Sequence, residues 1–258
     1  MSEASQTSVL RFPDDSGRSL GETLDELPIG AVLEIAPGRY DGPVAIRRAC
    51  ALRGAGDLTR IELGEGAVSI EVDGAVELSS LAIEGGEGVE VRAGDVRLHN
   101  VHVQNARSTF GGALTVHGGN VEAHRLRVGH AYADEGGGVG VGAGATLMLE
   151  DSQVEDTEAA RGGAFFLKPG AEVRLVGVTI RKARASASQG GQALYVDSRA
   201  EQPTSLAFER VRLEDVPLGL PLVVDPAHVP NISIRGCDMP RIVLDTPGVV
   251  DEGENDWR

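Results

Sequence analysis

Residues 95–103 read DVRLHNVHV, and this nine-residue pattern decides the fold. Apolar and polar residues alternate on either side of the pair His99 and Asn100, so two short strands meet at a bend. The same pattern recurs as AVELSSLAI (75–83), NVEAHRLRV (120–128), TLMLEDSQV (146–154), EVRLVGVTI (172–180), SLAFERVRL (205–213) and NISIRGCDM (231–239). The first apolar positions of successive copies are 20 to 33 residues apart, a step that fits one coil of a repeat protein.

A second alternating strand follows in each coil, usually after a pair of glycines, as in GGALTV (111–116) and GGAFFL (162–167). Stacking the coils places equivalent residues about 4.8 Å apart, so that like residues form columns along the axis. Val96, Val121 and Leu147 are expected to share one interior column. The pattern predicts an all-β fold, a single-stranded right-handed parallel β-helix (a solenoid) of about seven to nine coils.

The chain divides into four expected segments. They are an N-terminal arm (1–18), a short N-terminal capping helix (19–29), the parallel β-helix (30–247) and an acidic C-terminal tail (248–258). Ser19 and Glu22 have the spacing of a capping box, and a helix here would cover the unpaired end of the solenoid. Cys50 and Cys237 fall at interior positions, which predicts buried thiols and no disulfide.

The formal charge of −15 argues against a nucleic-acid partner or an anionic membrane surface, because both repel an acidic protein. No basic stretch followed by an apolar run opens the chain, and no segment is long and apolar enough to span a bilayer. A cytoplasmic location is therefore expected. The oligomeric state is left open.

Residues 30–56 read GAVLEIAPGRYDGPVAIRRACALRGAG, with a P-G-x-Y turn and an L-R-G-x-G turn. This stretch resembles the opening coil of the pectin-lyase-like superfamily. The later glycine-pair turns are similar to those of bacterial right-handed β-helix repeat proteins. The resemblance covers about residues 19 to 245 and implies the fold more than the function, since this architecture carries lyases, hydrolases, epimerases and adhesins alike.

The catalytic motifs of the enzymes in that superfamily are largely missing. Of the polygalacturonase motifs, only the dipeptide Gly129-His130 occurs, although glycoside hydrolysis needs paired carboxylates. We also expect no strand column to place two acidic residues in adjacent coils, as calcium-dependent lyases do. No catalytic residue is therefore assigned with these motifs.

Three residues on one outward column are weaker catalytic candidates. His99 and His124 occupy equivalent positions in successive coils, and Glu150 follows in the next. Two imidazoles and a carboxylate spaced by one rung could hold a metal or support proton transfer. A polar corner exposed to water would have the same sequence, so we assign no metal here.

Thr115, Phe166 and Tyr195 form an outward column on the second strand, with Gly140 between them. Sugar rings stack on aromatic side chains, and a glycine would let a flat ligand approach. These three residues are the predicted ligand-binding set. Stacked aromatic rings also stabilise a sheet without any ligand.

A group of acidic residues lies in the projecting loops, namely Asp134, Glu135, Glu155, Asp156 and Glu158. They could gather calcium, but their spacing follows no fixed ligand pattern, and solvated loops have the same composition. We expect no cofactor, with calcium as the one possible exception.

Taken together, these features favour a non-catalytic β-helix that acts as a binding or structural module. It would contact a polysaccharide or a protein partner through an outward flank and its loops. One alternative is a carbohydrate-active enzyme of the pectin-lyase type (lyase, hydrolase or epimerase) with an atypical site. The other is an assembly or spike-like structural protein whose end docks to another copy.

Overall fold

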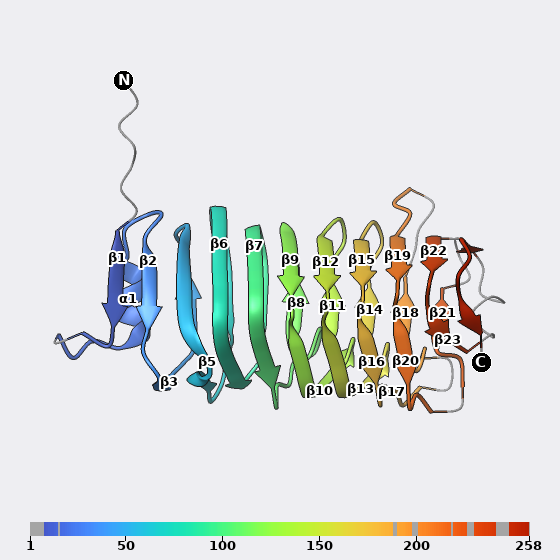
Figure 1. Ribbon diagram of the computed structural model, residues 1–258, viewed down its shortest axis with the longest axis horizontal. Helices are drawn as coiled ribbons and strands as arrows, with labels where there is room; N and C mark the ends of the chain where they lie inside the picture. The colour runs from blue at the N-terminus through green and yellow to red at the C-terminus, as the bar shows by residue number, and fades with distance from the viewer. Residues whose placement is uncertain are drawn as a thin grey trace, which may run out of the picture.

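The computed structural model describes residues 8–14, 16–187, 190–197, 201–217, 219–225, 230–240 and 248–257. Over these residues the chain is a parallel β-solenoid of about nine turns with a single short helix. The strands stand side by side along the long axis, from β1 at one end to β24 and β25 at the other (Figure 1). The fold expected from the nine-residue repeat is thus confirmed.

Three columns of parallel strands, here called sheets 1, 2 and 3, form the sides of the solenoid. Three long strands bend around corners and contribute to more than one side: β5 (Cys50–Leu63), β6 (Val68–Gly85) and β7 (Val89–Gln104). Sheet 1 otherwise contains β1 (Val9–Phe12), β2 (Val32–Ile35), β9 (Asn120–His124), β12 (Thr146–Glu150), β15 (Glu172–Val176), β19 (Ser205–Glu209), β22 (Asn231–Arg235) and β24 (Val249–Asp251).

The other two sides are built from the second half of each nine-residue repeat and from the strand after the glycine pair. Sheet 2 adds β3 (Gly38–Asp41), β10 (Arg127–Glu135), β13 (Gln153–Arg161), β16 (Thr179–Arg181), β17 (Arg184–Ala185), β20 (Arg212–Glu214), β23 (Asp238–Met239) and β25 (Asp256–Trp257). Sheet 3 adds β4 (Val44–Ile46), β8 (Leu114–Val116), β11 (Val139–Val141), β14 (Phe165–Leu167), β18 (Leu194–Val196) and β21 (Leu222–Val224).

The bend inside each repeat has one backbone conformation. Asn100, Gly177 and Gly236, expected at this corner, have φ values of 52°, 63° and 60°. The same positive φ occurs at Ser80, Arg125, Asp151 and Arg210 in the equivalent positions. The corner therefore requires the left-handed region even where the residue is not glycine, because the chain must turn from sheet 1 into sheet 2.

The interior columns are in the expected register. Val96 pairs with Val121, Val121 with Leu147, and the same column continues through β15, β19 and β22. Ser152, the polar member of a neighbouring interior column, is satisfied because its hydroxyl accepts from Leu126 N at 3.0 Å and donates to Glu150 O at 2.8 Å. Cys237 is buried with a free thiol, as expected.

Local structure covers part of each end of the solenoid. Helix α1 (Leu20–Glu26) begins at the capping box of Ser19 and Glu22 and buries Leu20 and Leu24 against the first coils. Part of the expected N-terminal arm forms β1, and two short parts of the expected tail form β24 (Val249–Asp251) and β25 (Asp256–Trp257). At that end Asn255 Oδ1 accepts from Cys237 N at 2.7 Å, where another coil would have supplied a carbonyl group.

No helix among the described residues is long and apolar enough to cross a membrane.

Candidate functional site

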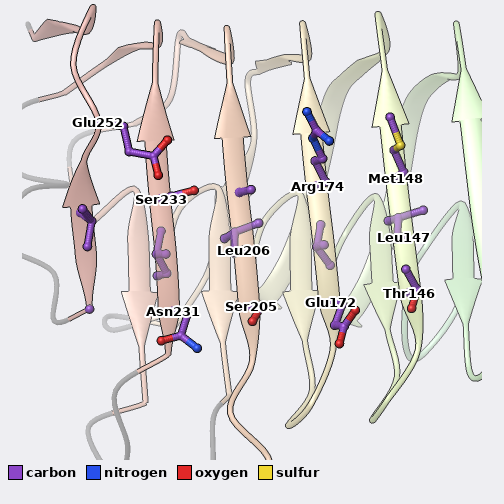
Figure 2. A pocket seen from close by; sticks show the side chains of 15 residues that line it. Thr146, Leu147, Met148, Glu172, Arg174, Ser205, Leu206, Asn231, Ser233 and Glu252 are labelled. Carbon is purple, nitrogen blue, oxygen red and sulfur yellow. The ribbon is translucent and has the colours of Figure 1, made fainter.

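A groove of about 530 Å³ lies on the outward face of sheet 1, over β12, β15, β19, β22 and β24. Its lining side chains come from five successive strands, so the groove runs across the strands and along the solenoid axis (Figure 2). A cavity of this size is in the usual range for a small-molecule or oligomer site. We call it the sheet 1 groove.

The floor of the sheet 1 groove is one outward column. Pairing between neighbouring strands aligns Met148, Arg174, Ala207, Ser233 and Val250 in that order. The column is hollow in the middle because Ala207 and Ser233 have short side chains, between the longer side chains of its neighbours. The depression therefore follows directly from side-chain size at consecutive rungs.

One edge of the groove is a second outward column of polar residues. It aligns Thr146, Glu172, Ser205 and Asn231, which present hydroxyl, carboxylate and amide groups (Figure 2). These short side chains offer both donors and acceptors to a ligand in the groove. The combination of a partly apolar floor and a polar edge is typical of sites that bind polar molecules with an apolar face.

The charges in the groove do not cancel. The Arg174 guanidinium donates to Glu209 Oε2 at 3.1 Å, and this hydrogen bond lowers the pKa of the Glu209 carboxyl. Glu209 also pairs with Arg210. By contrast, Glu172 and Glu252 line the groove, are exposed, and have no cation within ion-pairing distance in the described part of the chain. The groove is therefore acidic.

The three weaker catalytic candidates lie together at one end of this face. His99, His124 and Glu150 line a smaller depression of about 190 Å³, which adjoins the groove because Met148 lines both. The two imidazole rings are stacked, with centroids 5.2 Å apart and planes inclined by 3°. Stacked rings in this arrangement do not direct their nitrogen atoms at a common point, as metal ligation requires.

The two ring nitrogens of His124 have different surroundings. Its Nε2 lies 3.5 Å from Asp151 Oδ2, and its buried Nδ1 has no hydrogen-bond partner. Among the residues that the structure describes, no group of three or more His, Cys, Asp or Glu side chains could hold a metal ion. The sequence thus identified neighbours correctly, and their use in catalysis stays a prediction.

The predicted ligand-binding set has the expected register but not the expected exposure. Phe166 pairs with Gly140 and Tyr195, and Gly140 with Thr115, in one outward column of sheet 3. All three members of the set are nevertheless buried, with 4% of Thr115, 2% of Phe166 and 8% of Tyr195 exposed. The expectation of an open aromatic face was therefore wrong.

Phe110 covers this column. A Cβ atom at Gly140 would lie 2.9 Å from two atoms of the Phe110 ring, so the glycine accommodates a side chain of the chain itself. Phe110 meets Phe166 edge to face at 6.1 Å, and the guanidinium of Arg161 lies 5.1 Å from the centre of the Phe166 ring. The rings form a second small core outside the solenoid, and their ligand-binding role stays untested.

The acidic residues that were expected in projecting loops lie instead on strands β10 and β13, and most of them are paired with cations. Glu135 pairs with Arg161, Glu155 with Arg181, and the Lys182 ammonium lies 3.7 Å from Asp156 Oδ2. The Arg181 hydrogen bond holds the pKa of the Glu155 carboxyl below its ordinary value. These pairs leave few of the five carboxylates for calcium.

One expectation about acidic columns was wrong. Glu62 pairs in register with Glu84, and Asp238 with Asp256, so acidic residues do occupy adjacent coils. The register shifts in β5 around Gly56 concealed the first pair from the repeat alignment. Glu62 and Glu84 bind Arg39 and Arg60 respectively, which separates the like charges.

The sequence patterns did not lead to a prediction of the sheet 1 groove. Its signal was present, because the outward positions that read Glu77, Arg97 and Glu122 in the first coils become Ala207 and Ser233 later. Two short side chains in consecutive outward positions indicate a depression once the register is known.

Comparison with known proteins found no matching family model, no matching curated protein and no matching solved structure. The resemblance to the pectin-lyase-like superfamily accordingly rests on the sequence patterns and on the parallel solenoid, and the function must be argued from the geometry of the site.

Proposed function

We propose that this chain is a non-catalytic β-helix binding module that holds an extended polysaccharide in the sheet 1 groove. The observation that carries the proposal is a hollow floor that crosses five strands beside a continuous polar edge. A glycan places its hydroxyl groups at its edges and C–H groups on its ring faces. The edge of Thr146, Ser205 and Asn231 suits the hydroxyls, and the floor at Ala207 suits the faces. The cytoplasmic location expected from the sequence remains a prediction.

A polysaccharide fits this face better than a folded protein partner does. A stable protein interface covers about 800 Å² per partner around an apolar centre. Large exposed apolar side chains are scattered over the described chain, and of these Val250 alone lines the groove. A groove that crosses five strands and has no broad apolar patch beside it favours a linear occupant.

The positions of the free carboxylates favour binding over hydrolysis. Glycosidases place two carboxyl groups about 5 to 9.5 Å apart around one bond. Glu172 is on β15 and Glu252 follows β24, three rungs further on, so their rungs are about 14 Å apart. These two residues cannot flank a single glycosidic bond.

Binding can be tested by calorimetric titration with neutral, acidic and amino-sugar oligosaccharides. Ala207→Arg fills the middle of the floor, and we expect it to weaken glycan binding at least tenfold, equivalent to about 1.4 kcal/mol. Ala51→Arg is the matched control, since Ala51 lies in the same outward column in the first coils and lines neither depression. Absence of glycan binding, or equal loss in both variants, would refute the proposal.

A second candidate is a carbohydrate-active enzyme that uses His99, His124 and Glu150. It is favoured by the continuity of their depression with the groove through Met148. Release of reducing ends or of unsaturated products from any glycan would establish an enzyme. If turnover were found and His124→Ala left it unchanged, these residues would not be the catalytic set.

A further inference from the structure

We infer that the polysaccharide bound in the sheet 1 groove carries free amino groups, an inference that rests on the proposed function. It follows from the charges that the groove leaves unpaired. Glu172 and Glu252 are both carboxylates, and the cation among the lining residues, Arg174, is already bound by Glu209.

The unpaired charges exclude an acidic polysaccharide. A uronate chain would bring its carboxylates against Glu172 and Glu252, and the charge of Arg174 is already partly neutralised by Glu209. The net charge of −15 adds repulsion at longer range. A cationic chain would be attracted instead, because its ammonium groups can pair with these carboxylates without breaking an existing ion pair.

The spacing of the carboxylates indicates a polymer rather than a small cation. Glu172 lies at the polar edge and Glu252 near the far end of the groove (Figure 2), with rungs about 14 Å apart. Glu150, in the adjoining depression, also has no cation partner in the described part of the chain. A chain with amino groups at regular intervals can meet several of these carboxylates at once.

An amino-glycan suits this face better than a basic peptide. Extended peptides are usually held by the main-chain groups of an open strand edge, or by pockets for alternate side chains. The main-chain groups of β15, β19 and β22 are engaged in pairing with their neighbours in the sheet. The floor at Ala207 and Ser233 is part of one continuous column and not a set of separate side-chain pockets, and the hydroxyl and amide groups of the edge match hydroxyl groups.

The test compares glucosamine oligomers with N-acetylglucosamine oligomers of the same length, at a pH where the free amine is protonated. The free-amine oligomer should bind about tenfold more tightly at low salt, and added salt should reduce this advantage. Glu172→Gln and Glu252→Gln should each weaken its binding about twofold to fivefold, and the double variant about tenfold. Neither the added salt nor any of the three variants should change the affinity for the acetylated oligomer.

Glu77→Gln is the matched control, because Glu77 lies on the same face, pairs with Arg53 and lines neither depression. Equal binding of the two oligomers would overturn this inference while leaving the proposed function intact. Failure of every oligosaccharide to bind would overturn both. Binding of a lysine oligomer as tight as that of the glucosamine oligomer would overturn the assignment to a glycan.

Discussion

The outward face of sheet 1 has two halves, which differ in how many of their charged side chains form ion pairs. Over β6, β7 and β9 the floor column carries Glu77, Arg97 and Glu122, and Arg97 Nε lies 3.4 Å from Glu122 Oε2. Over β12 to β24 the same column contains Ala207 and Ser233, while Glu172 beside it has no cation partner in the described chain. We call these the paired half and the groove half.

The interior does not share this difference. Leu78 and Leu98 in the paired half, like Leu149 and Leu175 in the groove half, are at most 1% exposed and belong to one core. The solenoid is therefore held from inside by the same packing throughout. The outward residues can therefore differ between the two halves without any change in the core.

The largest effect should come from interior substitutions, and it should be the same in both halves. Leu78→Ala and Leu175→Ala each remove a buried side chain, and each should lower the free energy of unfolding by about 2 to 5 kcal/mol. Urea unfolding monitored by circular dichroism would measure it. A large cost in one half alone would show that the solenoid is not uniformly packed and would break the comparison.

A smaller, pH-dependent effect should come from His102, which lies outside both halves, on the sheet 2 part of β7. Burial lowers the pKa of its imidazole below 6.5, and Arg127 lowers it further, against the raising effect of Asp57 at 3.5 Å. Between the folded pKa and 6.5 the unfolded chain binds the extra proton. His102 therefore makes its full contribution to the free energy of unfolding above pH 6.5. This contribution decreases as the pH falls below 6.5, by at most about 1.4 kcal/mol per pH unit.

His102→Gln should flatten this part of the stability profile, as followed by thermal unfolding at a series of pH values. His117→Gln is a suitable control, because His117 is more exposed and pairs with Glu90 on another side of the solenoid. A profile unchanged by His102→Gln would show that other groups cause the dependence.

The smallest effect should come from the charge column itself. Arg97 and Glu122 are 69% and 64% exposed, so a double-mutant cycle with alanine should give a coupling energy of about 0.2 to 1 kcal/mol that declines with salt. Their replacement should not alter the glycan binding that is proposed for the groove half. A coupling energy well above this range would mean that the outward charges contribute substantially to the folding stability of the paired half.

The sequence by itself determined the solenoid, its N-terminal cap and the register of the nine-residue repeats, but not the register shifts in β5 around Gly56. Those features depend on local alternation, on the recurrence of one nine-residue pattern every 20 to 33 residues and on the Ser19–Glu22 capping box, all of which are visible in the sequence. It also identified His99, His124 and Glu150 as neighbours, because a column follows directly from the register.

Tertiary structure alone decided what covers each outward column. Phe110 folds over Gly140 and buries the aromatic residues, and Asp57 reaches Arg127, 70 positions away, at 2.7 Å. Such contacts depend on the length and path of irregular segments, which carry no periodic signal. The groove appeared for the same reason, since a depression depends on the relative heights of side chains from five coils. Repetition fixes which residues stack, and only the folded chain shows which of them remain open.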